Sequence, residues 1–163
     1  MSDSVAAQLQ IAVANQLAGD PMFNGTQSAN AKPIPIIADT KGDIPTQIKT
    51  ALSKLGVCVV ILTPLFELFD NYLPSTAGWM RMAVDVFEDV LFNGNSTQVT
   101  ADEICERIVI LMQRFLLGPG WAFNTIGEQS FFRIDNITFV DVGPPIHYTV
   151  NLRANVMLTS PAG

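Results

Sequence analysis

The sequence predicts an α+β fold, with an antiparallel or mixed sheet of four to five strands and helices packed mainly on one face. Three observations support this prediction: strict alternation over residues 146–158, a capping box at Thr100, and a β-branched run over residues 57–62. The predicted elements follow the order helix, extended strap, helix, strand, strand, helix, strand, strand. This order is typical of helices that cover one face of a sheet.

A length of 163 residues is that of one domain, and we expect a single domain over the whole chain. Residues 1–42 are predicted to form an N-terminal helix, a loop and a Pro-rich strap, and residues 43–158 the α+β core. The helix is expected over residues 3–17, where apolar side chains recur at helical spacing, and residues 19–32 have loop composition. The strap over residues 33–37 contains two prolines, so it can serve only as an edge strand or a covering segment.

The first core helix has well-defined predicted ends. Asp43 is a good N-cap, Pro45 fits the first turn, and Gly56 is expected to end the helix. The β-branched run that follows is typical of a strand covered on both faces, and Pro64 limits its length.

The second core helix is predicted from its capping box. The Thr100 hydroxyl accepts from the amide of Glu103, whose carboxylate accepts from the amide of Thr100. An apolar stripe then continues as far as Phe115, so the helix is expected to end at Gly118.

Three further strands are predicted from alternation. Between Trp79 and Phe87 every even-numbered residue is apolar, whereas the odd-numbered face is partly polar. Residues 131–142 are predicted to form a strand in which the alternation changes phase: Phe132 and Ile134 are even-numbered, whereas Ile137 and Phe139 are odd-numbered. Either a bulge near Asp135 shifts the register, or both faces of the strand are covered. The last strand, over residues 146–158, alternates throughout.

The composition favours a protein that buries surface against other subunits. Hydrophobic residues make up 48% of the chain and charged residues only 15%, so few polar side chains remain to cover a lone monomer. The net charge of −6 and the dispersed nine basic residues argue against tight nucleic-acid binding. An acidic surface still suits a passage through which DNA slides as a non-specific polymer.

The chain shows neither a secretion signal nor an apolar run of the ~20 residues that span a bilayer. We therefore expect no membrane partner and assembly in the cytoplasm. Cys58 and Cys105 lie in apolar patterns without a second Cys or His nearby, which favours buried, reduced thiols over a disulfide.

Residues that could carry catalysis are scarce. His147 is the only histidine, and it falls in the middle of a predicted strand, so a Ser/His/Asp or Cys/His arrangement has one possible centre. One His and two separated Cys do not supply a zinc site, and no phosphate-binding glycine loop occurs. The acidic pairs Glu88-Asp89 and Asp102-Glu103 have ordinary structural explanations in a strand and a helix first turn. We expect no enzyme activity, no metal and no cofactor.

Five segments resemble, in order and in pattern, the tail terminator (tail completion) proteins of long-tailed bacteriophages: "ALSKLG", "VCVVILTP", "WMRMAVDVFEDVLFN", "TADEICERIVILMQRFL" and "IHYTVNLRANVML". The resemblance covers roughly residues 43–158. It implies a small α+β subunit that forms a homo-oligomeric ring, expected to be a hexamer, which caps the tail tube and ends its polymerisation. The implied partners are the tail tube protein and the head-tail connector protein, and the implied location is the neck or tail of the virion.

Candidate contact residues for such an assembly fall into an apolar and a charged group. The apolar group lies in polar loops, although Phe23 could instead pack on its own core; its members are Met22, Phe23, Trp121 and Phe123. The charged group shares strand parity and could pair with a neighbouring subunit or simply be solvated; its members are Arg81, Asp85, Arg133, Asp135 and Arg153. Charge reversal at Arg81 or Arg153 is expected to impair ring formation more than folding.

Two other classes of function remain open from the sequence. The chain could be another phage neck, head-completion or tail tube subunit, which would differ in copy number or stacking. It could also be a small α+β enzyme or ligand-binding domain that uses residues 121–127 as a pocket wall.

Overall fold

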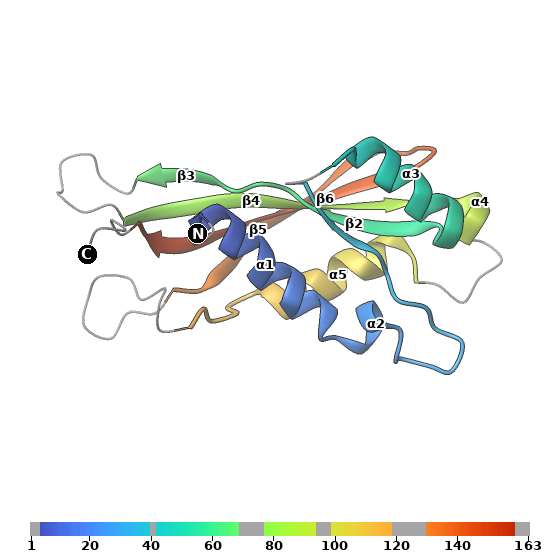
Figure 1. Cartoon of the computed structure of the whole chain (residues 1–163), viewed down its shortest axis with the longest axis horizontal. Helices are drawn as coiled ribbons and strands as arrows, with labels where there is room; N and C mark the ends of the chain where they lie inside the picture. The colour runs from blue at the N-terminus through green and yellow to red at the C-terminus, as the bar shows by residue number, and fades with distance from the viewer. Residues whose placement is uncertain (1–3, 40–41, 69–76, 94–98, 119–129, 159–163) are drawn as a thin grey trace.

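A computed structural model describes residues 4–39, 42–68, 77–93, 99–118 and 130–158, which build one open sheet with helices mainly on one face (Figure 1). The predicted α+β class is confirmed. The described helices are α1 (Val5–Ala18), α2 (Pro21–Asn24), α3 (Ile44–Leu55), α4 (Val90–Asn93) and α5 (Ala101–Met112). The strands are β1 (Ile36–Ala38), β2 (Val57–Ile61), β3 (Leu65–Leu68), β4 (Ala77–Glu88), β5 (Phe132–Asp141) and β6 (Ile146–Met157).

The sheet has six described strands in five positions. Their order is β1, β2, β4, β6, β5, and β3 pairs with the same side of β4 as β2 does. β2 pairs with residues 84–88 of β4 and β3 with residues 78–81, so these two strands follow one another along β4 on either side of Pro64. Only β1 and β2 run parallel, which makes the sheet mixed, and β1 is the edge strand formed by the Pro-rich strap.

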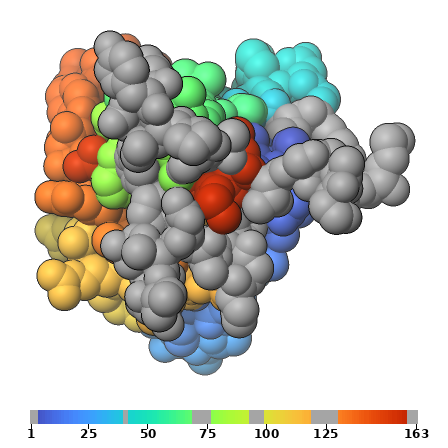
Figure 2. Space-filling view, turned by 90° about the vertical axis from the view of Figure 1, so that its left-hand side faces the viewer, coloured from blue at the N-terminus to red at the C-terminus, as the bar shows by residue number. Residues whose placement is uncertain are grey.

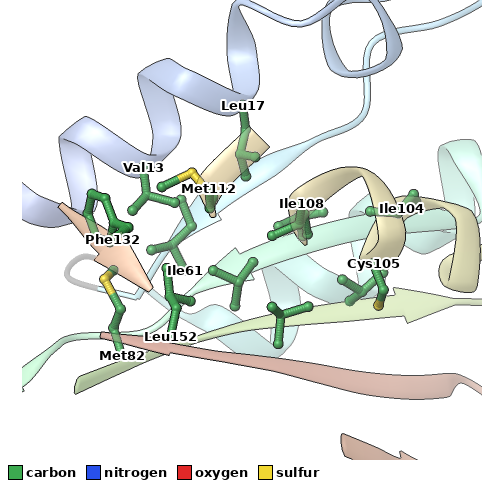
Figure 3. Packing of buried hydrophobic residues seen from close by; sticks show 14 of the residues in the cluster. Val13, Leu17, Ile61, Met82, Ile104, Cys105, Ile108, Met112, Phe132 and Leu152 are labelled. Carbon is green, nitrogen blue, oxygen red and sulfur yellow. The ribbon is translucent and has the colours of Figure 1, made fainter. Parts of the chain in front are cut away.

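The main core lies between the sheet and the helices α1 and α5. β4 and β6 pair without interruption from Ala77↔Met157 to Glu88↔Ile146, so their even-numbered residues form one apolar face. Figure 3 shows Val13 and Leu17 of α1, together with α5 side chains, packed towards this face. Each Leu, Ile or Phe buried here stabilises the fold by roughly 1.5–3 kcal/mol.

α3 covers the other face of the sheet at its β1 and β2 end. Its Ala51 and Leu52 pack with Ile37, Cys58 and Val60 in a second, smaller cluster. β2 is therefore buried on both faces, as its continuous apolar run predicts. The predicted caps of α3 are confirmed: the Asp43 carboxylate accepts from Thr46 N at 3.3 Å, and Gly56 has φ of 80°.

α5 begins at the predicted capping box, with Thr100 N donating to Glu103 Oε2 at 3.3 Å. The predicted end at Gly118 is wrong, because α5 ends at Met112. Beyond it Arg114 has φ of 61°, and Leu116 forms an antiparallel bridge with Phe131. The chain leaves the helix because backbone pairing with the start of β5 replaces the helical hydrogen bonds.

The predicted bulge in β5 is confirmed. Its register against β6 shifts between Ile134 and Asn136 and again between Phe139 and Asp141. The shift keeps Phe132, Ile134, Ile137 and Phe139 on one face although their parity changes.

Two buried polar contacts attach α1 to the rest of the fold. Gln10, which is 2% exposed, donates from Nε2 to Ile61 O at 3.0 Å and to Asp39 Oδ1 at 2.9 Å. At the other end of α1, Asp20 caps α2 by accepting from Met22 N at 3.0 Å and accepts from Arg107 Nε of α5 at 3.0 Å. The hydrogen bond from Arg107 holds the pKa of Asp20 below its usual value of 3.8, although burial acts to raise it.

We predict that Asp20→Asn lowers the free energy of unfolding by about 2 kcal/mol at about pH 7, because asparagine keeps the cap but loses the charge that Arg107 binds. A depressed folded-state pKa contributes stability above the unfolded pKa and loses it as the pH falls through the folded value. The difference between variant and wild type should therefore shrink below about pH 4 in urea titrations.

Asp43→Asn is the matched control, because it changes an N-cap that has no described arginine partner. It should change stability little. Equal losses for Asp20→Asn and Asp43→Asn, or a difference that does not depend on pH, would show that the Arg107 contact does not hold α5 to α1.

Candidate assembly interface

Three arginines lie side by side on the polar face of the sheet. The register pairs Arg81 of β4 with Arg153 of β6, and Arg153 with Arg133 of β5. We call these three residues the arginine row. The register therefore places Arg81, Arg133 and Arg153 on one face of the sheet, as strand parity predicts.

Two acidic residues balance two members of the arginine row. Asp135, displaced by the β5 bulge, lies with Oδ1 3.1 Å from Arg153 Nε and with Oδ2 3.9 Å from Arg81 Nη1. Glu67 of β3 accepts from Arg81 Nε at 2.7 Å, and this hydrogen bond raises the pKa of Arg81. The four charges sum to zero, so this part of the predicted contact surface is already compensated within one chain.

Arg153 and Arg133 differ in their surroundings. The Arg153 guanidinium lies 4.4 Å from the centroid of the Trp79 ring, and its side chain is 20% exposed. Arg133 is exposed, and within the described residues it forms no ion pair. Arg153 is therefore mainly a structural residue of the sheet, whereas the Arg133 charge is not balanced by another described residue.

Asp85 also makes its contacts within the sheet. It accepts from the Thr149 hydroxyl at 2.7 Å, and its Oδ1 lies 3.4 Å from His147 Nε2. The His147 ring stacks on Phe87 with centroids 4.2 Å apart. Asp85 and His147 are 14% and 21% exposed, so this pair offers little surface to a second molecule.

The predicted apolar loop contacts are only partly described. Phe23 is 2% exposed and belongs to the main core. The structure therefore confirms the alternative prediction that Phe23 packs on its own chain. Met22 packs against the same core and is half-buried. Phe23 is therefore not a free contact surface, and Met22 is partly covered by the core. Trp121 and Phe123 lie outside the described residues.

Among the described residues, the His, Cys, Asp and Glu side chains do not form a metal-binding group, and both thiols are buried. No three His, Cys, Asp or Glu side chains in this part of the chain are grouped so that they could hold a metal ion. Cys58 and Cys105 are buried and free, as predicted, and burial raises the pKa of each thiol to about 12. At that value a thiol is almost wholly protonated near neutral pH and is a poor nucleophile. No helix in the described ranges is long and apolar enough to cross a membrane.

An exposed apolar cluster at one end of the molecule was not predicted from the sequence. It consists of α4 and the β5–β6 turn, and we call it the tip, with members Val90, Leu91, Phe92 and Val142. These side chains are 53%, 81%, 54% and 76% exposed, and three of them border a hollow of about 310 Å³. The sequence does contain a signal for the tip: residues 90–92 are three consecutive apolar residues between Asp89 and Asn93, and they fit neither the helical nor the alternating pattern of a buried element.

The opposite end of the molecule contains a hollow of about 500 Å³. We call it the arginine pocket; it is lined by Gln113, Arg114, Leu116, Phe131 and Arg133. Figure 2 faces this end and shows the segment after α5 beside the start of β5. Arg114 lines this pocket because α5 ends at Met112. The sequence did not indicate this, because its helical pattern continues to Phe115.

No protein-family model matches the chain, and no curated protein sequence matches it.

We predict that Arg153→Ala lowers the free energy of unfolding by on the order of 1–2 kcal/mol, because it removes the stacking on Trp79 and leaves Asp135 with a weaker partner. Arg133→Ala changes the same residue type in the same row and should leave stability unchanged within the error of a urea titration. If the two variants were equally stable, the distinction between a structural and a free arginine would be wrong.

Proposed function

We propose that this chain is a structural virion subunit that forms a ring, caps the tail tube of a long-tailed bacteriophage, ends tail polymerisation and joins the tail to the head connector. The resemblance of five ordered segments to tail terminator proteins supports the phage assignment and the expected six copies. The tail tube protein and the head connector are the partners implied, and DNA is only a passing polymer.

The single observation that supports an assembling subunit best is the tip. A folded chain rarely leaves consecutive apolar side chains so exposed unless another surface covers them. The tip projects from an end of the sheet and surrounds no described catalytic group. Its chemistry suits contact with protein better than the binding of a small polar substrate.

The composition agrees with this proposal. Charged residues are only 15% of the chain, and the arginine row shows that several of them are paired internally. Fewer charges remain to keep a lone subunit hydrated, so burial between copies is favoured. The net charge of −6 also suits a ring through which DNA slides, since it repels rather than holds the polyanion.

Native mass spectrometry and negative-stain electron microscopy of the purified chain test the proposal. We expect closed rings with six-fold symmetry and the corresponding mass. Long stacked tubes would assign the chain to the tail tube instead. A monomer at all concentrations, or a monomer that binds a small metabolite, would overturn the assembling role.

A further inference from the structure

We infer that the tip of one copy docks into the arginine pocket of the next copy, so that one head-to-tail contact repeats around the assembly. The inference deepens the proposed function and rests on it for the existence of a ring. The surfaces that make the contact, however, are defined by the described residues alone.

The arginine pocket has the size and walls of a binding site. Its volume of about 500 Å³ falls within the range of roughly 300–1,000 Å³ that is usual for such sites. The walls are fixed by the backbone: Arg114 N donates to Phe132 O at 2.9 Å, Phe132 N to Phe115 O at 2.9 Å, and Leu117 N to Ser130 O at 2.9 Å. A partner therefore meets a preformed hollow rather than a surface that must first be ordered.

The charge of the pocket selects an acidic partner. Arg114 and Arg133 are both exposed, and neither forms an ion pair with another described residue. Asp135, two residues after Arg133 on β5, is already engaged by Arg153, and Glu67, engaged by Arg81, lies on β3 beyond β6 and β4. Two guanidinium groups that have no ion-pair partner among the described residues therefore stand beside the apolar side chains of Leu116 and Phe131, and the fitting ligand is apolar with a carboxylate rim.

The tip has this complementary chemistry. Asp89 directly precedes the apolar residues of α4, and Asp141 directly precedes Val142. Each uses one carboxylate oxygen locally, Asp89 Oδ1 accepting from Leu91 N at 3.0 Å and Asp141 Oδ1 from Gly143 N at 3.1 Å. A second oxygen on each remains to accept from an arginine. Leu91, at 81% exposure, is the side chain best placed to enter a pocket.

Charges near the tip do not cancel this acidic character. The first turn of α5, at the same end of the molecule, adds Asp102 and Glu103. Lys54 adds one positive charge nearby, because it lies in the last turn of α3, where Gly56 O accepts from Asp89 N at 2.7 Å, but it is outnumbered by these acids. The tip therefore presents an apolar centre with acidic residues around it.

The position of the two surfaces requires a second copy. Figure 1 places α4 and the β5–β6 turn at one end of the long axis, and the start of β5 at the other. The tip of a molecule thus cannot reach its own pocket. A contact between two different surfaces is heterologous, and its repetition produces either a closed ring or an open filament.

Two variants that block opposite sides of the contact test the inference. Arg114→Glu combined with Arg133→Glu blocks the pocket and leaves the tip intact, whereas Leu91→Arg blocks the tip and leaves the pocket intact. We expect each alone to raise the concentration needed for assembly by about tenfold or more. Mixed in equal amounts, they should form complexes that contain both variants in equal numbers, as measured by native mass spectrometry.

Matched controls separate this contact from general effects. Ile11→Arg places the same charge on an exposed apolar position of α1, and Lys49→Glu reverses a charge in the middle of α3; both should assemble as wild type does. Val142→Arg blocks the same tip from the β5–β6 turn and should behave as Leu91→Arg does. Circular dichroism should show that all variants are folded, because each changes side chains that are exposed in the structure.

The possible failures are distinguishable. If the wild type forms rings and the blocked variants do so equally well, the head-to-tail contact is wrong and the proposed function stands. If Leu91→Arg and Val142→Arg differ in effect, or mixing restores nothing, the contact is also wrong. If the wild type never assembles, the proposed function itself fails.

Discussion

The uninterrupted pairing of β4 with β6 is the constraint on which the rest of the structure depends. Each strand has 12 residues, and a slip of one residue would move every side chain to the opposite face of the sheet. Strict alternation in both strands excludes such a slip, because it would bury arginines and expose valines. The core face, the polar face and the direction of the molecule's long axis all follow from this one register.

The same register explains why part of the polar face is already compensated within one chain. The ladder brings Arg81 and Arg153 within reach of acidic neighbours, which compensate them. Arg133, beside Arg153 in the same row, and Arg114 form no ion pair with another described residue, and at the far end of the sheet the residues of α4 remain exposed. An elongated sheet with unlike ends is suited to repeated head-to-tail contact.

Elements with a single local signal could be predicted from the sequence, and elements set by distant contacts could not. Alternation predicted β4 and β6, and caps predicted α3 and the start of α5, since all of these signals lie within one turn or one strand. The early end of α5 depends on Phe132, 20 residues beyond Met112 in the printed sequence, and the burial of Phe23 depends on helices elsewhere. For the same reason strand parity placed the arginine row on one face, but it did not reveal the ion pairs, Arg114 or the tip.

Residue-resolved hydrogen exchange measures most directly whether the β4–β6 ladder supports the whole fold. We expect the amides of Val84, Val86, Val150 and Leu152 to exchange slowest and only through global unfolding, while those of β1 and β3 exchange through local opening. If the β4 and β6 amides instead exchanged as fast as those of β1, the ladder would not be the element on which the rest depends.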